Sequence, residues 1–123
     1  MSGEQAAFEP LYIKSGPGQT GTLAPSVTVA ATDAGVASAV LPGSNGNNFT
    51  QLQIANVTAG TSWAYVNLGR FGSVTAATVA TGFPIAPNSV IVITVDPEVN
   101  GAHVIMGTAA ATANVIFTRG QGL

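Results

Sequence analysis

Residues 87–97, PNSVIVITVDP, contain a run of β-branched residues enclosed between two prolines. Valine and isoleucine favour strands because their branched side chains pack well on a pleated surface. Proline lacks a backbone N–H donor, so it is found at the ends and edges of strands rather than inside a sheet. The stretch therefore predicts a strand over Ser89–Val95, the most apolar strand of the chain.

Shorter runs of the same kind lie on both sides of this strand, separated by turn residues. No segment has the residue spacing of a convincing amphipathic helix. Short strands with frequent turn signals are typical of sandwiches and barrels. We expect an all-β fold, an antiparallel β-sandwich of about eight strands of jelly-roll type, with an immunoglobulin-like sandwich as the alternative. The other strands are expected at Val27–Thr32, Val36–Leu41, Phe49–Val57, Ser62–Leu68, Val74–Ala80, Ala102–Gly107 and Thr112–Thr118.

The alternation of side chains within these runs predicts which residues share a face of each strand. Leu52, Ile54 and Asn56 share one face of their strand, and Trp63 and Tyr65 share one face of theirs. A tryptophan and a tyrosine on one exposed face could stack against a sugar, whereas a buried pair would belong to the core or to a subunit contact. Asp33-Ala34-Gly35 predicts a hairpin turn between the first two strands.

Residues 1–26 differ from the rest of the chain and predict an extended N-terminal arm in front of a single domain, residues 27–123. An apolar patch in the arm is followed by a linker rich in Gly and Pro. Apolar side chains contribute about 1.5–3 kcal/mol each only when they are buried. We therefore expect the patch to dock on a neighbouring molecule rather than on its own domain. The patch consists of Phe8, Leu11, Tyr12 and Ile13.

The chain has few charges: Lys plus Arg total 3, Asp plus Glu total 5, and charged residues make up 7% of the sequence. So few basic residues exclude a nucleic-acid partner that is bound through its phosphates. Residues 71–95 carry no charge, but Gly82, Pro84 and Pro87 interrupt them, and we expect no membrane association. A free domain so poor in charge tends to associate, so we expect much of its surface to be covered.

The residues that could carry chemistry are sparse. His103 is the single histidine, no cysteine is present, and the pattern Gly-x-Ser-x-Gly of a serine nucleophile is absent. Asp96, Glu98 and His103 together contain metal-binding groups, but their spacing matches no metal motif. Residues 16–21 match G-x-G-x-x-G, yet a Val/Thr-rich strand follows where a nucleotide site needs a helix. We expect neither an enzyme nor a bound cofactor or metal.

Four segments in order, Gln51–Asn56, Ala64–Gly69, Phe83–Ser89 and the ending Phe117–Leu123, resemble small virion proteins of tailed bacteriophages. The resemblance covers residues 45–123 and points to head decoration, or cement, proteins. It implies a structural protein without catalytic residues, placed on the outer surface of an icosahedral head. Its partners would be the major capsid protein and further copies of itself, as a dimer or a trimer.

This interpretation gives a set of candidate contact residues for the capsid or for a second subunit. They are Phe8, Leu11, Tyr12, Ile13, Phe117, Arg119 and Leu123. The alternative is a component of the phage tail, baseplate or fibre that binds host glycan. In that case Trp63 and Tyr65 are the candidate contacts.

Overall fold

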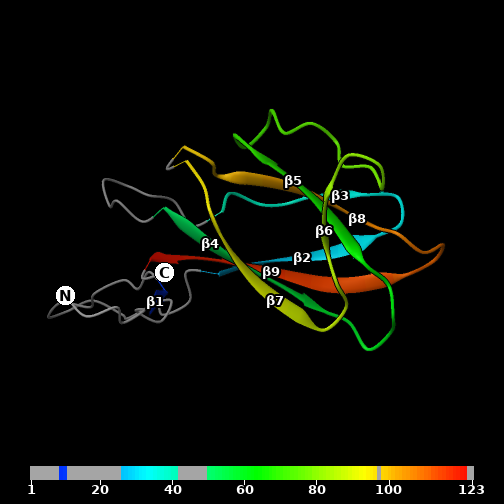
Figure 1. The fold of residues 1–123 in the computed structure, drawn as a ribbon. Coiled ribbons are helices and arrows are strands. Elements are labelled where there is room, and N and C mark those ends of the chain that lie inside the picture. Colours follow the sequence, from blue (N-terminus) through cyan, green and yellow to red (C-terminus); the bar gives the residue numbers. More distant parts are fainter. Residues whose placement is uncertain (1–8, 11–25, 42–49, 97, 122–123) are drawn as a thin grey trace, which may run out of the picture.

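The computed structural model describes residues 9–10, 26–41, 50–96 and 98–121. Within these residues the chain forms strands joined by turns and loops, and no helix (Figure 1). The strands are β1 (Glu9–Pro10), β2 (Ser26–Thr32), β3 (Val36–Ala37), β4 (Gln51–Val57), β5 (Ala64–Gly69), β6 (Phe83–Ile85), β7 (Ser89–Thr94), β8 (Gly101–Met106) and β9 (Thr112–Gln121).

The strands form two antiparallel sheets, so the protein is an all-β sandwich, as the sequence predicts. The first sheet has the order β2-β9-β4-β7, and the second has the order β3-β8-β5-β6. In Figure 1, β9 runs between cyan β2 and green β4. The short strand β1 pairs with the end of β9 through Glu9 with Gln121 and Pro10 with Gly120. These two residues of the expected arm therefore extend the chain's own sheet.

The core lies between the two sheets and is built from alternate residues of each strand. On β4, Leu52 and Ile54 are fully buried, and Asn56 shares their face. On β5, Ala64 and Val66 point inward and Tyr65 lies on the opposite face, while Trp63, just before the strand, is exposed. The predicted faces of both strands are therefore confirmed. The core cluster also includes Val29, Ala31, Leu41, Ile85, Val95, Ala102, Val104, Met106, Ala113, Val115 and Phe117.

The predicted hairpin at Asp33-Ala34-Gly35 is wrong, although the turn itself is present. The Gly35 N–H donates to the Thr32 carbonyl over 3.2 Å, and Gly35 has a φ of 88°. However, β2 pairs with β9 and β3 pairs with β8, so the turn carries the chain from one sheet to the other. The residues of a turn determine that the chain reverses direction. Which sheet the next strand joins depends on which distant strand it can pair with.

The strand predicted at Val74–Ala80 is also wrong, because these residues form a loop. Residues 70–82 cross the outward face of the β3-β8-β5-β6 sheet. The Asn67 side-chain amide on β5 donates to the carbonyls of Thr75 (3.0 Å) and Ala76 (3.3 Å). The Ala77 N–H donates to His103 Nδ1 on β8 over 3.0 Å, and the Ala77 side chain is buried. Valine and threonine favour a strand, but here side chains of the sheet bind the backbone groups of the segment.

Strand β6 was not predicted from the sequence, and Pro84 lies in its middle. The structure resolves the conflict by placing β6 at the edge of its sheet, where Pro84 lies opposite Tyr65. An edge strand tolerates proline because only one side of it needs hydrogen-bond donors. The strand predicted at Val36–Leu41 is shorter than expected, since β3 ends at Ala37.

Candidate interaction surface

The outward face of the β2-β9-β4-β7 sheet is a regular surface that spans four strands of the described chain. Its side chains lie in rows across four strands, because the pairing registers align them. One row runs from Thr28 on β2 through Ile116 and Ala55 to Val90 on β7. The next runs from Ser26 through Thr118 and Gln53 to Val92. Such rows form a continuous pleated surface of small and branched side chains.

No charged side chain is present among the outward residues of β2, β4, β7 and β9. Val90 is 57% exposed and Val57 is 51% exposed, so aliphatic groups on this face meet water. A partner that covers the face would not have to remove water from any charged side chain of these strands, and such desolvation is costly. The face is therefore suited to burial against another protein surface.

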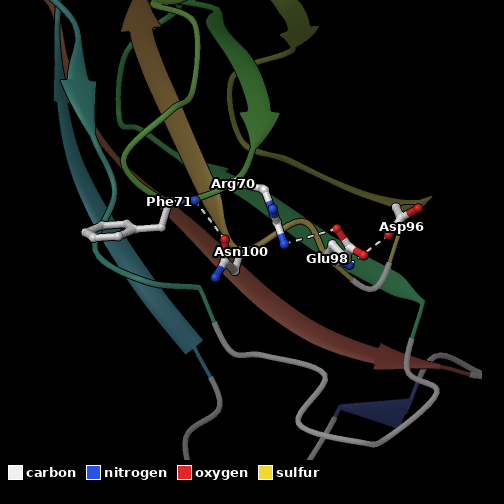
Figure 2. A network of polar contacts seen from close by, with 5 residues as sticks. All are labelled: Arg70, Phe71, Asp96, Glu98 and Asn100. Atoms are coloured by element: carbon white, nitrogen blue, oxygen red, sulfur yellow. Dashed lines mark hydrogen bonds and ion pairs between the residues drawn. The ribbon is translucent and has the colours of Figure 1, made fainter.

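The charged side chains of the described residues lie elsewhere. Arg70, at the end of β5, pairs with Glu98 in the β7–β8 loop at 3.2 Å, and both side chains are about 70% exposed. Figure 2 shows this pair beside Asp96, whose Oδ1 accepts the Glu98 N–H at 2.8 Å. On the far side of Arg70, the Phe71 N–H donates to Asn100 Oδ1 over 2.7 Å. These contacts hold two loops together at one end of the sandwich.

Two of the predicted contact residues, Phe117 and Arg119, lie in the interior with 0% exposure. Phe117 packs in the core between the sheets. The Arg119 guanidinium donates to the Val99 carbonyl, and burial lowers the pKa of this arginine. The folded domain therefore presents neither side chain to a partner, and both act in holding the chain together. Phe8, Leu11, Tyr12, Ile13 and Leu123 lie outside the described residues.

The two aromatic residues predicted to share a face differ in exposure. Trp63 is 44% exposed, so its ring is available to a ligand. Tyr65 is half-buried and packs between two glycines. A Cβ on Gly82 would lie 2.7 Å from the Tyr65 Cβ, and one on Gly107 would lie 2.7 Å from the Tyr65 Cε1. Tyr65 is thus fixed against the backbone, and Trp63 alone offers an open ring on this strand.

His103 has a structural environment. Its Nδ1 accepts the Ala77 N–H over 3.0 Å, so this ring nitrogen is already bound to a backbone group. The ring also lies against the β2–β3 turn, where a Cβ on Gly35 would come within 2.6 Å of His103 Cε1. Among the described residues no group of three or more His, Asp or Glu side chains could hold a metal ion. The structure thus does not bring Asp96, Glu98 and His103 together.

Two shallow depressions accompany these surfaces. One, of about 360 Å³, lies where β2, β4 and β9 meet the β4–β5 loop and is lined by alanines, threonines, Val57 and Asn114. The other, of about 250 Å³, lies between β3, β8 and the start of the 70–82 loop, with Ser38 and His103 in its lining. Ser38 Oγ accepts the Ala102 N–H at 2.9 Å, so both polar side chains already bind backbone groups.

Comparison of the chain with models of protein families, with curated proteins and with solved structures found no match. Within the described residues there is also no helix long and apolar enough to cross a membrane.

The sequence analysis did not single out the residues of the uncharged face. The signal was nevertheless present, because every second residue of Ser26–Thr32 is a serine, threonine or alanine. Alternation identifies the solvent side of a strand, but whether neighbouring strands form one continuous face depends on their register.

Proposed function

We propose that this protein is a structural virion protein that decorates the outer surface of an icosahedral phage head and stabilises contacts between capsomers. The observation that carries the proposal is the uncharged outward face shared by β2, β9, β4 and β7. The resemblance of residues 45–123 to phage virion proteins supports it. Only 7% of the residues are charged, and a surface so poor in charge tends to associate with other proteins. On the outside of a particle, such a face would be covered by the capsid subunits.

The strand order gives further support. From β2 to β9, each connection passes to the opposite sheet except the one from β5 to β6. We assign this order to the jelly-roll type, in which two Greek keys wrap around one core. Jelly rolls recur in viral capsid proteins and in lectins, so the assignment agrees with both candidate functions. Fold alone does not define function, and the surface therefore carries the argument.

The proposed mechanism depends on multivalent attachment to the assembled shell. The uncharged face would lie against capsid subunits, and the N-terminal segment of residues 1–26 would add a second attachment. Two linked contacts bind more tightly than either alone, because the second forms within the complex. A ligand that binds only the assembled state shifts the equilibrium toward that state. The shell would therefore gain resistance to heat and to denaturant.

The first experiment measures the copy number of this chain relative to the major capsid protein in purified source particles, by quantitative mass spectrometry. A ratio near one, or a simple fraction such as about one third, supports a head protein, since a shell holds hundreds of subunits. A ratio of a few per cent contradicts the head assignment. Absence from the particles contradicts the virion assignment altogether.

A second experiment tests the face itself with the variant Thr28→Lys. Thr28 is exposed on the uncharged face, at its β2 edge, so lysine there leaves the fold intact and places a charge in the contact. We expect binding to heads that lack the protein to weaken about tenfold or more, as measured by co-sedimentation. The matched control is Val79→Lys, on the loop over the other face. Equal binding by Thr28→Lys and the parent protein would rule out this face.

The role of the N-terminal segment is tested by deleting residues 2–14. Because every residue of the core cluster lies within residues 27–117, the shortened chain should still fold. We expect it to lose binding to heads, since the apolar patch expected to dock on a neighbour is removed. Unchanged binding would refute the arm as an attachment.

A tail, baseplate or fibre component that binds glycan is the second candidate, because the Trp63 ring is exposed. Binding of host glycans to the isolated protein should then quench or shift the fluorescence of this tryptophan, the only one in the chain. The variant Trp63→Ala should lose glycan binding while keeping its far-ultraviolet circular dichroism. Glycan binding that survives Trp63→Ala would contradict this site.

A further inference from the structure

The strand β7 forms one edge of its sheet and lacks the usual protection of an edge. Among the described strands it pairs with β4 alone. Its sequence Ser-Val-Ile-Val-Ile-Thr contains no charge and no proline. Natural proteins protect exposed edges with charged residues, prolines, bulges or very short strands, because an unprotected edge pairs with strands of other molecules. The edges of the other sheet follow that rule, since β3 has two residues and β6 contains Pro84.

The pairing with β4 determines which backbone groups of β7 point to the open edge. The Val95 N–H donates to the Thr50 carbonyl over 2.6 Å, so position 95 is directed toward β4. Along an antiparallel strand this direction alternates from residue to residue. Ile93 and Ile91 are therefore also directed toward β4, in register with Leu52 and Ile54. The N–H and C=O groups of Val90, Val92 and Thr94 consequently point away from β4.

We propose that two copies of this chain pair through β7 in antiparallel orientation, with Val92 on the two-fold axis. In this register Val92 faces Val92 of the second copy, and Val90 faces Thr94 of the second copy. The outward N–H and C=O groups of all three residues are then satisfied by one another. On the core side, Ile91 lies opposite Ile93 of the second copy. The two sheets become one continuous sheet in which the uncharged face runs without a break across the dimer.

A second copy suits this edge better than a charged partner does. The free groups are symmetrical about Val92, so the edge is complementary to itself, as a two-fold interface requires. Val90, Val92 and Thr94 carry no charge, so two copies meet without repulsion, and a charged peptide would find no counter-charge on them. A strand of this length extends about 20 Å, so the buried area is small. We therefore expect a dimer of modest affinity, populated at about 100 μM.

Cysteine cross-linking tests the register directly, because the native chain contains no cysteine. In Val92→Cys the two Cα atoms across the axis would lie about 5.5 Å apart, within the range that a disulfide bridges. We expect mild oxidation to link most of the protein into dimers. The matched control is Thr28→Cys, on the outward face of the opposite edge strand, which should remain monomeric on a non-reducing gel. Linking at position 28 but not at position 92 would overturn the proposal.

Proline substitution tests the hydrogen bonds. Val92→Pro removes an N–H that β4 does not use, so the variant should keep its fold while the ring blocks the open edge. We expect sedimentation at about 100 μM to show the parent protein as a dimer and Val92→Pro as a monomer with unchanged circular dichroism. Val90→Lys provides a second variant if proline impairs folding. A parent protein that is monomeric at this concentration, or variants that remain dimeric, would refute the proposed interface.

These tests use the isolated protein, so they can fail without affecting the proposed binding to phage heads. Conversely, the dimer does not require a capsid function. A third result is also informative, in which the parent protein is monomeric but Val92→Pro loses binding to heads. It would replace the second copy by a strand of another protein and would contradict the dimer.

Discussion

The outward faces of the two sheets differ. Residues 70–82 cross the outward face of the β3-β8-β5-β6 sheet and form hydrogen bonds with Asn67 and His103. The described part of the chain places no loop across the outward face of the β2-β9-β4-β7 sheet. The first face is covered by a loop of the same chain. Glycines that contact Tyr65 and Val74 allow this loop to lie close to the sheet. The second is, among the described residues, a pleated surface with no charged side chain. The contrast shows that one face of the sandwich is covered by the chain's own loop, whereas the described residues leave the other face open.

The largest loss of stability should follow a substitution in the core between the two sheets. Phe117→Ala removes a fully buried ring and leaves a cavity, so we expect a loss of about 3–5 kcal/mol in the free energy of unfolding. Urea denaturation followed by circular dichroism measures this loss. The matched control Phe83→Ala, at a 42% exposed ring, should cost much less. A small loss of unfolding free energy in Phe117→Ala would contradict the placement of Phe117 in the core between the two sheets.

A smaller effect is expected where the 70–82 loop meets β8. Gly101→Ala would place a Cβ 2.7 Å from the Phe71 Cα and 2.8 Å from the Phe71 nitrogen, and backbone atoms cannot easily yield. We expect a loss of about 1–3 kcal/mol and a displaced loop. In Gly60→Ala the nearest atom is the Thr58 Oγ1 at 3.7 Å, so that control should be close to neutral. Thermal melting compares the two, and equal melting temperatures would mean that the loop does not press on the sheet.

The polar anchor of the loop can be removed separately. His103→Ala deletes the acceptor for the Ala77 N–H, and we expect a loss of about 0.5–1.5 kcal/mol. Amide hydrogen exchange at Ala77 should become faster, while exchange in β9 stays slow. His103→Asn restores an acceptor near the same position and should recover part of the protection. Unchanged exchange at Ala77 in His103→Ala would contradict the anchoring role.

The smallest effect should follow removal of the exposed ion pair. Arg70→Ala breaks the contact with Glu98, but both side chains are about 70% exposed, so water screens the pair. We expect a change of about 0–1 kcal/mol in stability, which should fall further at high salt. Chemical denaturation at two salt concentrations measures it. A large loss would show that charge, rather than loop packing, holds this end of the sandwich.

The sequence predicts much of this fold because alternation is a local property. It correctly identifies which residues of β4 and β5 share a face, and it locates most strands to within a few residues. It fails at Val74–Ala80, where strand-forming residues find no partner strand, and at β6, where Pro84 argues against a strand. It also fails at the β2–β3 turn. These errors share a cause, since each depends on which distant segment lies alongside.

The candidate contacts show the same limit. Phe117 and Arg119 were assigned to a surface because they belong to the distinctive C-terminal ending, yet alternation along β9 places them on the same side as buried Val115. The signal for burial was the alternation itself, because Val115 lies two residues before Phe117 and Phe117 lies two residues before Arg119. The charge of Arg119 argued against burial and obscured this signal. The uncharged face could not be found from one strand alone, because it arises only when four strands align.

The central position of β9 has a consequence for the order in which the molecule can form. β2 takes part in its sheet by pairing with β9, and β9 also separates β2 from β4. As the chain leaves the ribosome, β2 emerges early and must wait for almost the whole domain to be made. The sandwich cannot close strand by strand, and contacts between such distant segments form slowly. Folding is therefore a late and concerted event, during which the uncovered strands are open to pairing with a neighbouring nascent chain.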